Sequence, residues 1–311
     1  MFKNFFQKYD IFREDILIIA CSGGPDSMYL LAEVMKTQAR ETIIVAHFNH
    51  CLRGTESNRD EIFLQDFCKK NHLIFVSTRK DISRLSQESK KGIEETARIE
   101  RYSFLEQVRL QYSAKYILTA HHLDDSIETL MFNLIRGSKI HGLMGIPEQN
   151  GNILRPFGQV SKIEILKELE RENIPFRLDS TNADDVYLRN HLRLNIISEF
   201  ERINPEYRKN LASFMKYINE LGDFIDAQVV IFLRGETFFL VEDFFLQPSF
   251  LQKEIIRYLF AQANNGTIGL SEGGIAEIIR FIGDKGNYTQ KDLRKLHLEK
   301  KNSRVYFSSH I

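Results

Sequence analysis

The chain has 311 residues, of which 43% are hydrophobic and 27% are charged, a composition that is typical of a folded globular protein and excludes a disordered one. It carries 42 basic and 42 acidic residues, so its overall charge gives no indication of nucleic-acid binding. Three cysteines without a C-x-x-C pair exclude a disulfide framework, and the lack of a signal sequence or a run of about 20 apolar residues predicts a cytoplasmic protein with no membrane contact.

The first half of the chain alternates short apolar runs with amphipathic stretches. The runs predict strands at 16–20, 43–47, 73–77 and 116–120, and the stretches predict helices at 59–70, 93–112 and 124–136. This order is the βαβ rhythm of a Rossmann-like α/β fold with a parallel sheet. Because such sheets bind ligands beyond the carboxyl ends of their strands, we expect the loops after the first, second and fourth strands to line one crevice.

The first of these loops has the chemistry of a phosphate-binding turn. It consists of Ser22, Gly23, Gly24, Pro25, Asp26 and Ser27. The glycines allow a phosphate to approach the backbone, the serines add hydroxyl donors, and the following helix presents its positive end. A carboxylate repels phosphates unless a cation or a reacting group lies between them, so Asp26 indicates Mg²⁺ or chemistry. The alternative is an ordinary Gly-Pro turn.

The other two loops are rich in histidine and carboxylate. Residues 47–53 contain His47, His50 and Arg53, which suit structural hydrogen bonds and anion binding better than a metal site. In residues 121–129, Asp125 and Glu128 stand three apart, on one face of a helix. They are candidates for binding Mg²⁺, with Asp125 as the metal ligand, or for accepting a proton from an amine. The alternative is a helix cap, with Asp124 as the N-cap.

The second half is predicted to contain a smaller α+β domain. Helices are predicted at 161–172 and 187–200, and the Asn204-Pro205 break separates a domain at 1–204 from one at 205–311. The second domain begins with a helix at about 206–233. Strands at 237–241, 244–246 and 304–308 and helices at 250–263 and 274–281 follow. Two basic clusters, near 189–209 and from Lys285 onward, are either solvated faces or RNA contacts.

Six motifs, taken together and in order, resemble the series found in the tRNA(Ile)-lysidine synthetases. They lie at 22–27, 47–53, 95–102, 121–129, 155–157 and 179–193. The resemblance covers roughly residues 15–200 and implies an ATP pyrophosphatase domain of the adenine nucleotide alpha hydrolase-like kind. It implies a ligase that adenylates the wobble cytidine of the CAU-anticodon tRNA(Ile) and then replaces its C2 oxygen with the ε-amine of free L-lysine, releasing AMP and pyrophosphate.

The resemblance also assigns residues to roles. Those implied for catalysis are Asp26, Arg98, Asp125, Glu128, Arg189 and Arg193, and those implied for nucleotide binding are the loop at 22–27 with His47 and His122. ATP and Mg²⁺ are the expected cofactors, and tRNA binding is assigned to the second domain. From the residues alone, helix-surface pairing of Arg98 with Glu94 would be equally acceptable.

Three other functions remain open. A tRNA thiolase on the same scaffold would use a cysteine persulfide, and Cys21 and Cys51 adjoin site loops. A non-catalytic ATP-sensing module would not need the extra carboxylates, and an amidating synthetase would leave the basic tail without a role. The sequence also leaves open whether the protein forms a homodimer.

Overall fold

The computed structural model describes residues 2–52, 55–177, 191–264, 266, 269–284, 286 and 288–309. It divides into two compact units, unit 1 (Met1–Lys216) and unit 2 (Tyr217–Ile311). The division lies inside one long helix, α10 (Tyr207–Leu233), whereas the boundary expected from the sequence at residue 204 lies before that helix. No helix among the described residues is both long and apolar enough to span a bilayer.

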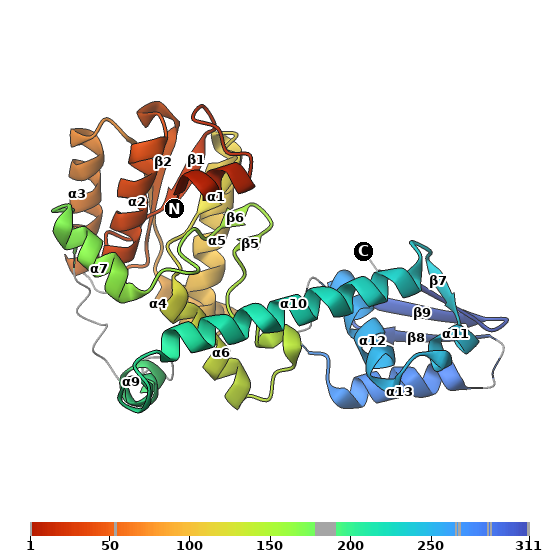
Figure 1. The fold of residues 1–311 in the computed structure, drawn as a ribbon. Coiled ribbons are helices and arrows are strands. Elements are labelled where there is room, and N and C mark those ends of the chain that lie inside the picture. The colour runs from red at the N-terminus through yellow and green to blue at the C-terminus, as the bar shows by residue number, and fades with distance from the viewer. Residues whose placement is uncertain are drawn as a thin grey trace. The chain divides into compact units, whose positions relative to one another are not determined.

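Unit 1 is built on a mostly parallel sheet with the strand order β3-β2-β1-β4-β6-β5 (Figure 1). Its strands are β1 (Leu17–Ala20), β2 (Ile43–Asn49), β3 (Ile74–Arg79), β4 (Tyr116–Leu118), β5 (Gln149–Asn150) and β6 (Ile153–Leu154). All neighbouring pairs are parallel except β5 with β6. The predicted Rossmann-like α/β fold is therefore confirmed, and β5 and β6 are short additions that the sequence did not indicate.

Helices cover both faces of this sheet because its strands alternate between two cores. Leu17 and Ile19 of β1 face a core shared with α1, α2, α3 and α7, and Ile18 between them faces a core shared with α4 and α5. The helices are α1 (Phe2–Lys8), α2 (Pro25–Thr37), α3 (Thr55–Lys70), α4 (Ile82–Ser89), α5 (Ile93–Gln111) and α7 (Lys162–Arg171). A 3₁₀ turn, η1 (Arg40–Thr42), precedes β2.

A third cluster of unit 1 fixes the helix that follows β4. Leu123, Ile127 and Leu130 of α6 (Leu123–Ile135) pack against Leu192 and Ile197. The latter two belong to a π-helix, η4 (Leu192–Ile197), which continues into α9 (Ser198–Ile203), and a 3₁₀ turn, η2 (Ile140–Gly142), follows α6. This packing places the first turn of α6 beside the carboxyl end of the sheet.

Unit 2 combines helices with an antiparallel sheet of order β7-β10-β9-β8. The strands are β7 (Phe238–Leu240), β8 (Tyr288–Leu293), β9 (Leu296–Lys301) and β10 (Arg304–Ser309), and the helices are the second part of α10, α11 (Val241–Leu246), α12 (Ser249–Asn264) and α13 (Glu272–Gly283). Asn302 and Ser303 both have positive φ, as a type I′ hairpin turn requires between β9 and β10.

Two expectations for unit 2 need correction. The predicted strand at 244–246 is wrong, because these residues lie in α11. Phe244 is buried in the core and Phe245 is exposed, a pattern that a run of three apolar residues cannot distinguish from a strand. The basic tail from residue 285 onward was expected to contain one strand, at 304–308, but its described part contains three antiparallel strands, β8, β9 and β10.

Candidate active site

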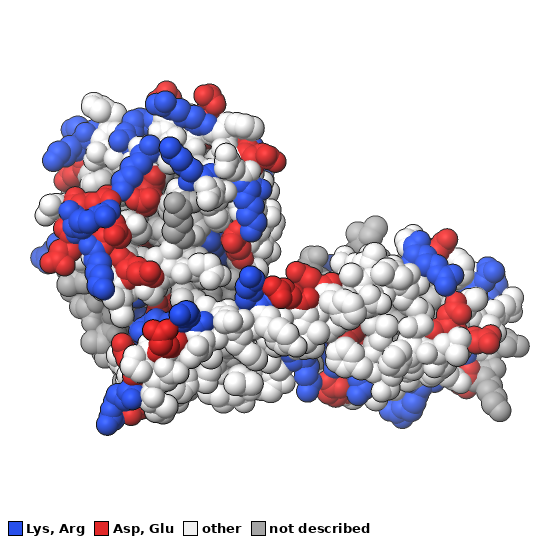
Figure 2. Space-filling view, in the orientation of Figure 1, with Lys and Arg blue, Asp and Glu red and all other residues white. Residues whose placement is uncertain are grey.

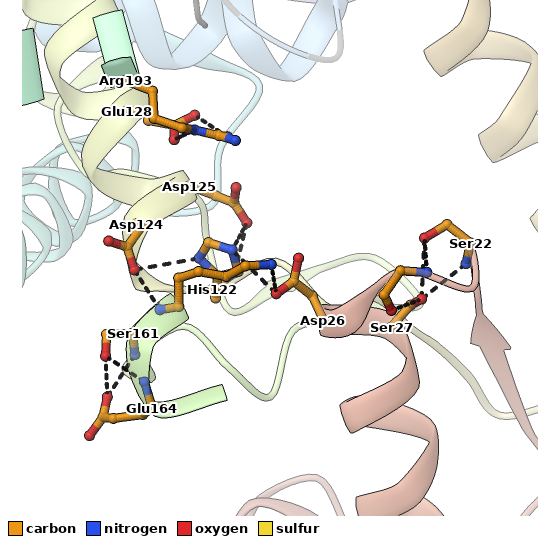
Figure 3. A network of polar contacts seen from close by, with 12 residues as sticks. Ser22, Asp26, Ser27, His122, Asp124, Asp125, Glu128, Ser161, Glu164 and Arg193 are labelled. Carbon is orange, nitrogen blue, oxygen red and sulfur yellow. Dashed lines mark hydrogen bonds and ion pairs between the residues drawn. The ribbon is translucent and has the colours of Figure 1, made fainter. Parts of the chain in front are cut away.

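The turn between β1 and α2 is ordered by its two serines. Ser27 Oγ accepts a hydrogen bond from the Ser22 backbone N–H at 3.1 Å, lies 3.2 Å from Ser22 Oγ and donates to the Gly24 carbonyl at 3.0 Å (Figure 3). Gly23 has φ +88°, a conformation that side chains disfavour, so the turn requires glycine there. Pro25 opens α2. The loop is thus held in shape, with Ser22 exposed and Gly24 partly exposed before the first turn of α2, where a phosphate can approach.

A cavity of about 580 Å³ opens at this turn. The loops after β1, β2 and β4 all contribute to it, as the topology predicted, and its lining includes Ser22, Asp26, Ser27, His47, Asn49, Arg101, His121 and Asp125. His47 is buried and donates a hydrogen bond from Nδ1 to the Cys21 carbonyl at 2.9 Å. It therefore ties the end of β2 to the phosphate-binding turn.

Asp26 lies at the start of α2 and points toward His122, as Figure 3 shows. Its Oδ1 is 2.5 Å from Lys162 Nζ and 3.7 Å from His122 Nε2. His122 is only 6% exposed, and its Nε2 also lies 3.6 Å from Oδ2 of Asp125. One imidazole therefore lies between the carboxylate of the phosphate loop and the carboxylate of α6.

The start of α6 differs from the predicted cap. His122 occupies the N-cap position, and its backbone N–H donates to Asp125 Oδ2 at 2.9 Å. Asp124 instead joins three helices, because it accepts from the Lys162 N–H at 2.7 Å and from Arg208 Nε at 2.8 Å. Burial raises the pKa of Asp124, but these hydrogen bonds outweigh it and the pKa is lowered. Asp124 is thus an ionised structural group, and Asp125 is the acid that reaches the cavity.

Glu128 follows one turn later on α6 and is 7% exposed. Arg193 holds it with two hydrogen bonds, from Nε at 2.5 Å and from a terminal nitrogen at 3.0 Å. The structure thus brings together two of the predicted residues that are far apart in sequence (Figure 3). The predicted Arg189 lies outside the described residues.

A cationic and aromatic group borders the cavity on α5. Arg98 and Arg101 both contact the ring of Tyr102, with their guanidinium carbons 4.9 and 5.1 Å from the ring centre. His121, hydrogen-bonded to Thr119 at 2.9 Å, is adjacent. Burial, followed by the charges of neighbouring arginines, lowers the pKa of His121 to about 3, so this imidazole is neutral at physiological pH.

Two residues of the site were missed from the sequence. Lys162 comes from α7, and Arg208 comes from α10. Ser161 and Glu164 form a capping box that could have marked Lys162 as the first residue of a helix. Nothing in the sequence pairs either residue with an aspartate of the site, because these pairs join segments that are distant along the chain.

Comparison with known proteins agrees with this geometry. The PP-loop domain family matches residues 1–200, which include the whole cavity. The chain belongs to the PP-loop family. The PP-loop domain is an ATP-binding domain, and the matched range contains the turn at residues 22–27, the cavity and the parallel sheet.

The chain is also similar to individual proteins whose activity is named. A tRNA(Ile)-lysidine synthase from Bacteroides thetaiotaomicron is 39% identical over 67% of this chain and 49% of its own length. One from Caldanaerobacter subterraneus subsp. tengcongensis is 28% identical over 92% of this chain and 64% of its own length. The chain spans about half the length of most curated relatives it matches. The U34-tRNA thiolase NcsA from Methanococcus maripaludis, with its 4Fe-4S cluster, shares the fold at a TM-score of 0.55 and 17% identity, over 67% of this chain and 73% of that one.

The PP-loop site offers oxygen donors for a cation. Asp26 and Asp125 both line the cavity beside the phosphate-binding turn. Among the described residues no group of three or more His, Cys, Asp or Glu side chains is arranged to hold a metal. Mg²⁺ commonly uses one or two carboxylates together with substrate phosphates and water, so this donor set fits a cation that is shared with a nucleotide.

Proposed function

We propose that this chain carries the catalytic machinery of a tRNA(Ile)-lysidine synthetase, which joins free L-lysine to C2 of the wobble cytidine in the CAU-anticodon tRNA(Ile) at the expense of ATP. The names of its curated relatives support this proposal. One structural observation carries it: the phosphate-binding turn and Asp125 of α6 line one cavity, and Asp26 and Asp125 approach the same histidine. The groups proposed to bind the nucleotide and the carboxylate proposed to react with the amine are thus close together.

The first proposed step is transfer of AMP. The C2 oxygen of cytidine attacks the α-phosphorus of ATP, the bond to the β-phosphate breaks, and pyrophosphate leaves. The backbone and hydroxyls of residues 22–27 would bind the departing pyrophosphate. We propose that Asp26 and Asp125 would hold Mg²⁺ during this step, and the cation would neutralise phosphate charge when bound. His47 keeps the turn in position through the Cys21 carbonyl.

The second proposed step is amine transfer. The ε-amine of lysine attacks C2, AMP leaves with the former C2 oxygen, and the nitrogen loses a proton. Lysine has a pKa of about 10.4, so deprotonation at pH 7 costs roughly 4–5 kcal/mol, which a nearby base offsets in part. We propose that Asp125 accepts this proton once it no longer holds a cation, because Asp125 lines the cavity, whereas both oxygens of Glu128 accept hydrogen bonds from Arg193.

Other parts of the chain are assigned to the tRNA. Arg98 is exposed beside the cavity and Arg101 lines it, so both can contact the anticodon region. We propose that unit 2 binds another part of the tRNA, that Arg193 orients the reacting groups through Glu128, and that the enzyme acts in the cytoplasm. A homodimer is compatible with this proposal and is not needed for it.

Two of the three cysteines, Cys21 and Cys68, do not favour thiolation, whereas Cys51 is exposed. Cys21 adjoins the phosphate-binding turn but is buried, and burial raises the pKa of its thiol. Burial also raises the pKa of Cys68, to about 12. A persulfide-forming cysteine needs the opposite, an accessible thiol with a lowered pKa.

The decisive experiment is incubation of the protein with ATP, radiolabelled lysine and total tRNA. Label that enters tRNA only when ATP is present supports the lysine ligase. Sulfur incorporation from a persulfide donor would select the thiolase instead, and binding of ATP with neither product would select the sensing module.

A further inference from the structure

The side chain of Lys162 reaches the phosphate-binding turn from a different helix. Its Nζ lies 2.5 Å from Asp26 Oδ1, across 136 residues of sequence. The two side chains are 33% and 30% exposed, so the pair lies at the edge of the cavity and is open to solvent. Lys162 is therefore the cation in closest contact with the acidic residue of this turn among the described residues.

The position of Lys162 is fixed by its backbone. Its N–H donates to Asp124 Oδ2 at 2.7 Å, and Asp124 is held in turn by Arg208. Ser161 and Glu164 cap the same helical turn reciprocally, at 2.8 Å and 3.3 Å (Figure 3). The side chain thus extends from an anchored start of α7, and its contact with Asp26 follows from this anchoring.

The contact occupies an oxygen that a divalent cation would need. Mg²⁺ and an ammonium group prefer the same ionised carboxylate, and one Oδ atom in contact with Nζ is not available to a metal. A partly exposed lysine–carboxylate pair is weak and exchangeable. Phosphate oxygens from a nucleotide would add both negative charge and further ligands, which shifts the competition toward the divalent cation.

We propose that Lys162 is the resting counter-ion of Asp26 and keeps divalent cations off this carboxylate until a nucleotide binds. Lys162 is then a positioning residue that couples cation binding to nucleotide binding. The proposal rests on ATP binding at the turn, which is part of the proposed function, but it does not depend on lysine or tRNA as substrates.

The test is a titration of the full-length, nucleotide-free protein with Mn²⁺, in which free Mn²⁺ is measured by electron paramagnetic resonance. Lys162→Met retains the backbone N–H and removes the charge, and we expect it to bind Mn²⁺ about fivefold more tightly than the unmodified protein. Lys36→Met is the matched control, because Lys36 pairs with Glu33 and Glu172 and not with Asp26. It should leave Mn²⁺ affinity unchanged.

A double variant, Asp26→Asn with Lys162→Met, should lose the tightening. Equal Mn²⁺ affinity in Lys162→Met and the unmodified protein, or tightening that persists in the double variant, would overturn the proposal. If Lys162→Met does not fold, Lys162→Gln is titrated in its place with the same expectation, and Lys162→Arg, which keeps the charge, should match the unmodified protein. The titration contains no ATP, lysine or tRNA. A failed lysine-transfer assay would therefore reject the proposed function without affecting the interpretation of the Mn²⁺ titration.

Discussion

The two units bury charged side chains in different ways. In unit 1, Asp26 and Asp125 line an open cavity, and both lie close to the buried side chain of His122. In unit 2, buried Lys300 donates to the backbone carbonyls of Ile282, at 2.8 Å, and Asp284. Buried Glu254 likewise pairs with Arg257, which also contacts Glu272.

The two units differ in the partners that their buried charged side chains find. A buried polar group must find partners, and in unit 2 these partners are structural, so the groups complete the fold. In unit 1 the partners are themselves side chains at a cavity, where a ligand can replace them. Figure 2 shows acidic and basic side chains interspersed on the visible face of unit 1. On this face the candidate site is therefore distinguished by the contacts among its side chains and not by a surface charge of one sign.

The largest effect is expected from Asp26→Ala. It removes the carboxylate from the phosphate-binding turn, and we expect substrate-dependent pyrophosphate release to fall at least about 100-fold with little change in melting temperature. Glu33→Ala is the matched control, since Glu33 lies on the same helix and pairs with Lys36. Pyrophosphate release at a near-normal rate in Asp26→Ala would remove Asp26 from the mechanism.

The carboxylates of α6 should separate the two chemical steps. We expect lysine transfer to fall about 100-fold or more in Asp125→Asn, and less in Glu128→Gln, because only Asp125 lines the cavity. At least one variant should still adenylate, as measured by trapping labelled AMP on tRNA. Asp81→Asn alters a helix cap elsewhere and should change neither step. Normal lysine transfer by both site variants would make the pair a structural cap only.

In unit 2, Lys300→Met should lower stability and leave nucleotide affinity unchanged. The side chain is 6% exposed, and its loss leaves carbonyls at the end of α13 without their donor. We expect a loss of about 1–3 kcal/mol in the free energy of unfolding, measured by urea denaturation. Lys301→Met, at the exposed neighbouring position, should stay within about 0.5 kcal/mol. Equal stability of the two variants would contradict the structural role.

The smallest effect is expected from the exposed bases of the unit 2 hairpin. Lys300, Lys301 and Arg304 belong to the basic cluster from Lys285 onward; Lys300 is buried, whereas Lys301 and Arg304 are exposed and suited to contact phosphates. Each substitution by alanine should flatten the slope of log affinity for tRNA against log salt by about 0.7 to 0.9, without changing ATP affinity. Filter binding at several salt concentrations measures this. Lys69 and Lys70, exposed at the end of α3, provide the comparison, and an unchanged slope would make the hairpin a solvated surface.

The sequence by itself determined the parallel sheet, the phosphate-binding turn and the loops that would share its crevice. These features depend on apolar periodicity and on the special backbone of Gly23, which act within a few residues. The placement of Asp125 and Glu128 on one helix could also be predicted from neighbouring residues alone. Arg193 was identified through its motif, but its partner was not.

Only the tertiary structure decided how the charged residues pair. Lys162 meets Asp26 across 136 residues because α7 packs against α2, and Arg208 meets Asp124 across 84 because α10 packs against α6. The same is true of Lys300, which the sequence placed in a basic cluster and which the structure buries against the end of α13. Charge along a sequence does not specify a partner, because the partner's position depends on how separate elements pack. Packing also decided the conformation of residues 244–246, where Phe244 enters the core of unit 2 from a helix.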